Sequence, residues 1–127
     1  MPITFTPVKK ITPLDLPIGF HSALFIETPA NKLYGCYYTR PPSKIWYNYE
    51  HSGVVGESSF SDKEAQILYD VLAEYTNSNE YQLHPYFNEK YLNSFHAPEY
   101  RGKPIRHNQM VLFLDFLKEC GGFKIIF

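Results

Sequence analysis

A capped amphipathic helix is the clearest pattern in the chain. Ser61 and Glu64 have the spacing of a capping box, in which each side chain accepts a backbone N–H at the helix start. Apolar residues then recur three and four positions apart, as on the buried face of a helix: Ile67, Leu68, Val71, Leu72 and Tyr75. The polar run over 76–79 predicts the end of this helix.

A second helix is predicted near the end of the chain, and it is far more apolar. Seven of the eight residues over 110–117 are apolar, which predicts a helix buried over most of its circumference. Asn108 is the expected N-cap, the glycines at 121–122 end the helix, and Cys120 is expected in the core. Three polar residues at helical spacing predict a narrow solvated stripe: Asn108, Asp115 and Glu119.

The segment before the first helix is rich in aromatic and β-branched residues, which favour strands. Turn-like sequences divide it into three predicted strands, over 20–28, 33–40 and 45–51, of which the first two form a hairpin. Residues 123–127 are predicted to add a C-terminal strand. The expected fold class is therefore α+β: a single domain over 1–127, in which an antiparallel sheet (hairpin, third strand and C-terminal strand) packs with two or three helices.

The first nineteen residues contain four prolines, at positions 2, 7, 13 and 17. Proline at this density prevents a helix, so residues 1–19 are predicted to be an extended N-terminal arm with a short edge strand over 3–5. Such an arm packs across its own domain. The alternative is exchange of the arm between two copies, which would make the protein a homo-oligomer.

Alternation along the predicted hairpin gathers tyrosines on one face of the sheet. Because successive side chains of a strand point to opposite faces, one face carries these residues, with an arginine at its edge: Tyr34, Tyr38, Tyr47, Tyr49 and Arg40. Tyrosine and arginine are enriched at the centres of protein interfaces, because they bury a large rigid area and keep a polar tip. We interpret this face as a candidate binding surface for a protein partner.

Composition narrows the classes of partner. The chain has 127 residues, 17% of them aromatic, and a formal net charge of −1. Duplex nucleic acid is not an expected partner, because nonspecific binding to it requires a basic surface. No signal peptide is apparent at the start of the sequence, and no apolar run is long enough to span a membrane, so we expect a cytoplasmic protein with no membrane association.

No catalytic or metal-binding motif is present in the sequence. The five histidines and two cysteines lack metal-ligand spacing, so no metal and no cofactor is predicted. The one cluster of positive charge is a basic loop at 101–107, close to the start of the second helix. It provides a candidate site for a small nucleotide or another anionic ligand: Arg101, Lys103, Arg106 and His107.

These observations favour a non-enzymatic protein-binding module. In size and composition the chain is similar to the small inhibitors and immunity proteins of bacterial and phage conflict systems, and this similarity assigns no role to any residue. The first alternative is a binder of a small nucleotide or anionic ligand at the basic loop. The second is a small enzyme in which the fold assembles a histidine and an acidic residue into one site.

Overall fold

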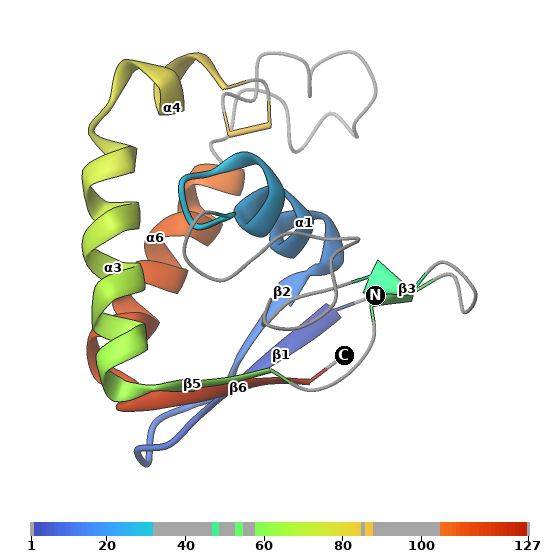
Figure 1. The fold of residues 1–127 in the computed structure, drawn as a ribbon, viewed down its shortest axis with the longest axis vertical. Helices are drawn as coiled ribbons and strands as arrows, with labels where there is room; N and C mark the ends of the chain where they lie inside the picture. Colours follow the sequence, from blue (N-terminus) through green and yellow to red (C-terminus); the bar gives the residue numbers. More distant parts are fainter. Residues whose placement is uncertain are drawn as a thin grey trace.

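The computed structural model describes residues 2–31, 47–48, 53–54, 58–84, 86–87 and 105–126. Its centre is a four-stranded antiparallel sheet with the strand order β2-β1-β6-β5. The strands are β1 (Pro2–Pro7), β2 (Leu14–Pro17), β5 (Ser58–Ser61) and β6 (Gly122–Ile126). Helices α1 (Ile18–Glu27), α3 (Asp62–Thr76) and α6 (Ile105–Glu119) lie on one side of this sheet (Figure 1). The predicted α+β class is confirmed.

Alternation along the strands gives the sheet one buried and one exposed face. The buried face contributes six apolar residues to the core beneath the helices: Ile3, Phe5, Leu16, Phe60, Phe123 and Ile125. The residues between them, such as Asp15, Ser59 and Lys124, are exposed to solvent. This period of two is the pattern expected of an antiparallel sheet that is covered by helices on one side only.

The N-terminal segment contributes more to the sheet than predicted. Residues 3–5 do belong to a strand, but β1 pairs with β2 on one side and with β6 on the other, so it is an interior strand and not an edge strand. Burial of Ile3 and Phe5 accounts for its position, because both side chains point into the core. Pro2 and Pro7 lie at the two ends of β1, where a missing N–H interrupts the hydrogen-bond ladder least.

The predicted strand over 20–28 is wrong, because these residues lie in helix α1 and in the turn that follows it. Pro17 is the N-cap residue of this helix, and Phe20, Ala23 and Leu24 are buried at the spacing of a helix face. The predicted hairpin therefore lacks its first strand. Its second strand, over 33–40, lies outside the described residues.

The predicted third strand, over 45–51, is described only at β3 (Tyr47–Asn48). This strand pairs with β4 (Gly53–Val54) in a separate two-stranded sheet, whereas the prediction placed it in one sheet with the C-terminal strand. The C-terminal strand itself is confirmed: β6 pairs with β1 and β5. The N-terminal hairpin of β1 and β2 thus provides two strands of the main sheet. The prediction had expected these positions to be filled from the segment 20–51.

Helix α3 agrees with its prediction at both ends, but Ile67, predicted on the buried face, is 38% exposed, and Val71 is only partly buried. Ser61 is the N-cap, its Oγ accepts the backbone N–H of Glu64 at 3.1 Å, and the Glu64 carboxylate accepts the N–H of Ser61 at 3.0 Å. The helix ends at Thr76, within the predicted polar run. Four residues of α3 face the core: Ala65, Leu68, Leu72 and Tyr75. The helix packs against α6 and β6.

Helix α6 differs from its prediction at its start and on its surface. It begins three residues before the expected cap Asn108, which instead lies on the exposed stripe together with Asp115 and Glu119. Val111 and Leu112 are 41% and 53% exposed, so the helix is less buried than the apolar run implied. Helix α6 turns into β6 through Gly121 and Gly122, whose φ angles of 67° and 104° favour glycine.

Candidate functional site

Helix α4 (Asn79–Leu83) forms a corner with the end of α3 and the start of α6. Ser78 fixes it: its Oγ accepts the backbone N–H of Tyr81 at 3.2 Å and donates to the carbonyl of Tyr75 at 2.6 Å. A serine cap so soon after the end of α3 redirects the chain across the end of the helical layer (Figure 1). It also turns the Tyr81 side chain inward, where it is buried.

A hollow of about 410 Å³ lies at this corner. Its lining comes from the last turn of α3, from α4, from the turn after α4 and from the first turn of α6: Thr76, Tyr81, Gln82, Phe87 and His107. Gln82 and His107 are exposed at its surface, whereas Tyr81 and Phe87 are only 5% and 4% exposed and form its floor. The volume lies in the range of pockets that bind small molecules or single side chains.

The floor of the hollow is held by ring contacts and one hydrogen bond. The ring centroid of Tyr81 lies 5.4 Å from that of Tyr75 and 5.1 Å from that of Phe87. The Tyr81 hydroxyl is hydrogen-bonded to Nδ1 of His107 at 2.7 Å, which ties α4 to α6 and orients the imidazole. Nε2 of His107 is the ring nitrogen that this bond does not use, so it is the one that a bound group could contact.

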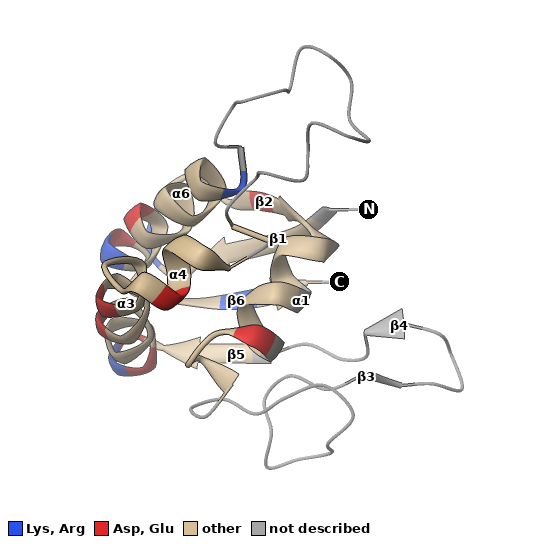
Figure 2. Cartoon of the chain, turned by 90° about the horizontal axis from the view of Figure 1, so that it is seen from above, with Lys and Arg blue, Asp and Glu red and all other residues tan. Residues whose placement is uncertain are grey.

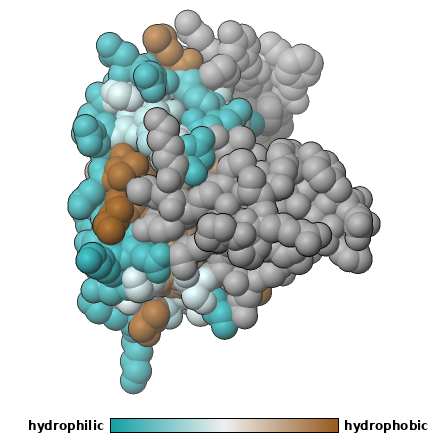
Figure 3. Space-filling model, viewed as in Figure 1, coloured by the Kyte–Doolittle hydropathy of each residue, from teal (hydrophilic) through white to brown (hydrophobic). Residues whose placement is uncertain are grey.

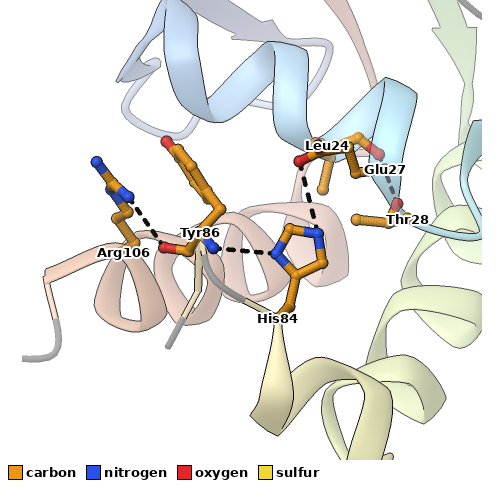
Figure 4. Close-up of polar contacts among 6 residues, drawn as sticks. All are labelled: Leu24, Glu27, Thr28, His84, Tyr86 and Arg106. Carbon is orange, nitrogen blue, oxygen red and sulfur yellow. Dashed lines mark hydrogen bonds and ion pairs between the residues drawn. The ribbon is translucent and has the colours of Figure 1, made fainter. Parts of the chain in front are cut away.

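A second polar cluster joins the turn after α4 to α1 and α6 (Figure 4). The backbone N–H of Tyr86 donates to Nδ1 of His84 at 3.1 Å, so the imidazole proton is on Nε2, which lies 3.5 Å from a carboxylate oxygen of Glu27. The guanidinium of Arg106 lies 4.1 Å from the centre of the Tyr86 ring and donates to the Tyr86 carbonyl at 3.2 Å. These contacts hold residues 84–87 between α1 and α6.

Acidic residues outnumber basic ones on two of the three helices around the hollow. Helices α3 and α4 together carry five acidic residues and one basic residue, Lys63, whereas α6 carries two of each. In Figure 2 the ribbon of α3 and of α4 is coloured red at the acidic residues. Burial raises the pKa of Tyr75, and the negative charges of Glu80 and Glu27 raise this pKa further. A negative potential therefore reaches the ring that packs against the floor of the hollow.

Exposed apolar side chains are scattered over the described surface. Leu83, which follows Gln82 in α4, is 76% exposed, and Val8, in the turn between β1 and β2, is 73% exposed. In the described part of the face shown in Figure 3, hydrophobic residues form small separate spots among hydrophilic ones. Leu83 is distinguished from the other exposed apolar residues by its position on the same short helix as two residues of the hollow.

The structure brings two of the predicted site residues to this corner. Arg106 and His107, from the predicted basic loop, lie in the first turn of α6, and His107 lines the hollow. Arg101 and Lys103 lie outside the described residues. The predicted tyrosine face lies there too: Tyr34, Tyr38, Arg40 and Tyr49 are not described, and Tyr47 is described only as part of β3.

Sequence reasoning missed most of the lining, because the segment 81–95 is ambiguous: Pro85 interrupts it, and residues 86–95 fit either a short helix or an irregular aromatic segment. The available indication was Ser78, which stands three residues before Tyr81, the spacing at which a serine caps a new helix. Thr76, Gln82 and Phe87 carry no sequence pattern that connects them to His107. Their association depends on the packing of α4 across α3 and α6.

The remaining described histidine and cysteine are structural. His21 lies in the core, and burial lowers its pKa to about 3, so it is neutral in the folded protein at ordinary pH. Cys120 is buried as predicted, and burial raises the pKa of its thiol, which disfavours the reactive thiolate. In the described part of the chain, no three histidine, cysteine, aspartate or glutamate side chains are placed to hold a metal ion.

Comparison with protein-family models, with curated proteins and with solved structures gives no significant match. No helix among the described residues is both long enough and apolar enough to cross a bilayer. The class of protein that the fold defines is an α+β domain with one face of its sheet covered by helices. The candidate functional site of this domain is the hollow at the corner of α3, α4 and α6.

Proposed function

We propose that this protein is a non-enzymatic binding module and that it binds a partner protein at the hollow between α3, α4 and α6. One observation carries the proposal: a rigid aromatic floor, formed by Tyr81 and Phe87, lies beneath the exposed side chains of Gln82 and His107, with Leu83 exposed on the same helix. Pockets with rigid aromatic walls and a few polar groups are where protein interfaces concentrate their binding energy.

Binding of a nucleotide by base stacking has less support at this site. A base stacks on the face of an aromatic ring, and Tyr81 and Phe87 are too buried to present one. The guanidinium of Arg106 already lies over the Tyr86 ring. The anion site predicted from Arg101, Lys103, Arg106 and His107 stays a prediction, because its first two residues lie outside the described part of the chain.

The enzyme alternative has less support from the described histidines, because the His84–Glu27 pair lies outside the lining of the hollow. An acid–base site would need two histidines, or a histidine and a carboxylate, facing one hollow. His107 is the histidine that lines this hollow, whereas His84 uses Nδ1 for the Tyr86 N–H and faces Glu27 with Nε2. The predicted tyrosine face would be a second surface of the same kind of module, and it stays a prediction.

Site-specific photo-crosslinking tests the proposal. A photoreactive phenylalanine analogue replaces Leu83 in one variant and Val8, which is equally exposed, in a matched control. Val8 lies in the turn between β1 and β2, at the opposite end of the molecule from α4 (Figure 1). We expect a discrete crosslinked protein from host cells with the Leu83 variant and none with the Val8 variant. Equal crosslinking at both positions would overturn the proposal.

A further inference from the structure

We infer that the hollow accepts a cationic side chain, lysine or arginine, from a basic segment of the partner. This inference rests on the proposed function and specifies the chemistry of the residue that enters the site. It is carried by the position of the hollow between the acidic helices α3 and α4 and by the hydrogen-bond acceptors on its lining.

The first argument is the negative charge beside the hollow, which comes from Glu74 and Glu80. Glu74 is two residues before Thr76, Glu80 directly precedes Tyr81, and both glutamates are exposed. Lys63, the single basic residue of α3 and α4, is at the other end of α3. Charges near a surface site attract an opposite charge over roughly a Debye length of about 10 Å, so both glutamates can act on a group in the hollow.

Arg106, the described cation that neighbours His107 in the sequence, is directed away from the hollow, which is the second argument. The guanidinium of Arg106 lies over Tyr86 and donates to the Tyr86 carbonyl. Arg106 is not part of the lining of the hollow, although it neighbours His107 in the sequence. A carboxylate or phosphate entering the hollow would therefore face Glu74 and Glu80 without direct contact to a fixed cation of the lining.

The lining offers acceptors, which is the third argument. The Thr76 hydroxyl donates its hydrogen to the carbonyl of Ala73 at 2.8 Å, so its oxygen can accept a hydrogen bond from a ligand. The exposed Gln82 side chain carries an amide oxygen. An ammonium or guanidinium group donates hydrogen bonds and never accepts them. It therefore matches both these acceptor oxygens and the negative charges of Glu74 and Glu80.

Selection from a library of random dodecapeptides displayed on phage tests this inference with the full-length protein. Binders are retained when replacement of Leu83 by Gln, which adds no charge, abolishes their binding, which restricts them to this corner. We expect the retained peptides to share a lysine or an arginine. In a synthetic peptide, norleucine in place of that lysine keeps the length but removes the charge, and it should weaken binding about tenfold or more.

Two protein variants separate the site from general charge attraction. Glu80→Gln removes one negative charge beside the hollow and should weaken binding of the lysine peptide about three- to fivefold. Asp70→Asn removes the same charge from an exposed position of α3 farther from the hollow, and it should change binding less than about twofold. Equal effects of the two variants would overturn the inference.

The outcomes distinguish the inference from the proposed function. Retained peptides that share an acidic residue, or that bind equally well with norleucine, would overturn the cationic specificity and leave the proposed function standing. If every selected peptide bound equally well to the Leu83→Gln variant, the binding site would lie elsewhere. That result would overturn the proposed function itself.

Discussion

Two regions of the described structure contain aromatic residues in different chemical settings. Beneath the helices, phenylalanines pack on one another: the ring centroids of Phe5 and Phe113 are 5.0 Å apart, and Phe60 and Phe123 stack at 4.6 Å. At the corner of α3, α4 and α6, the rings of Tyr75, Tyr81 and His107 carry polar atoms. The first region has no polar group to offer a ligand, whereas the second combines rigid rings with hydrogen-bonding groups.

This difference separates stability from binding. Eight of the ten phenylalanines are buried in the described part of the chain, and all but Phe87 of these lie away from the hollow, so phenylalanine mainly serves the core. The corner needs its aromatic rings for another purpose, namely to hold polar atoms at fixed positions near the surface. Changes in the core should therefore act on stability, and changes at the corner should act on binding with small effects on stability.

Truncation in the phenylalanine region is expected to have the largest effect. Phe113 is fully buried and contacts the rings of Phe5, Phe20 and Phe123. Phe113→Ala removes these contacts and leaves a cavity, which should lower the free energy of unfolding by about 3–5 kcal/mol. Urea denaturation followed by circular dichroism measures this loss. A decrease below about 1 kcal/mol would contradict the central position that we assign to Phe113.

Acid should reveal the buried histidine of the core. Burial keeps His21 neutral in the folded protein until the pH approaches about 3, whereas the unfolded chain takes up a proton near the ordinary pKa of 6.5. The unfolded state therefore binds more protons between these values. The stabilisation from neutral His21 is complete above pH 6.5, and about 2 kcal/mol of it is lost by pH 5.

His21→Phe isolates this contribution, because it keeps an aromatic ring beside Phe5 and Phe25. The measurement is the difference in unfolding free energy between pH 6.5 and pH 5 for each protein. This difference should be about 2 kcal/mol smaller in the variant than in the wild type. The same pH dependence in both proteins would show that His21 is not the group responsible.

The contrast between α3 and α1 explains how much of the fold could be predicted. Helix α3 has solvent on one side, so its apolar positions are periodic, and its capping box lies within four residues. Helix α1 buries Phe20, Ala23, Leu24 and Phe25 together with His21, so little polar periodicity remains. Its aromatic and apolar residues then resemble those of a strand. Burial on several sides removed the pattern that would have identified the helix.

The candidate site was less predictable than the fold, because its residues are distant in sequence. Arg106 and His107 were predicted site residues because they belong to a basic loop of the sequence. In the folded protein, the packing of α4 gives the two residues different environments. Arg106 interacts with Tyr86, and His107 interacts with Tyr81. A sequence pattern records the charge of such residues, and it contains no information about which neighbour each of them meets.

The smallest effect on stability is expected at the corner, from loss of one hydroxyl group. Tyr81→Phe keeps the ring contacts with Tyr75 and Phe87 but removes the hydrogen bond to Nδ1 of His107. The free energy of unfolding should fall by about 0.5–1.5 kcal/mol, the usual net contribution of one such bond. In contrast to Phe113→Ala, this variant should lose peptide binding at the hollow by a larger factor than it loses stability, because the imidazole is no longer oriented.

Long-range ¹H–¹⁵N NMR spectra of the histidine rings distinguish this explanation from a simple loss of stability. In the wild type, the bond from Tyr81 should fix one tautomer of His107, so its two ring nitrogens have distinct shifts. In Tyr81→Phe, exchange between tautomers should move the two shifts toward each other, while those of His84 stay unchanged because Tyr86 and Glu27 still hold its ring. Unchanged His107 shifts would mean that the hydroxyl does not orient the imidazole. The Tyr81 side chain would then support the hollow only through the packing of its ring, as Phe113 supports the core.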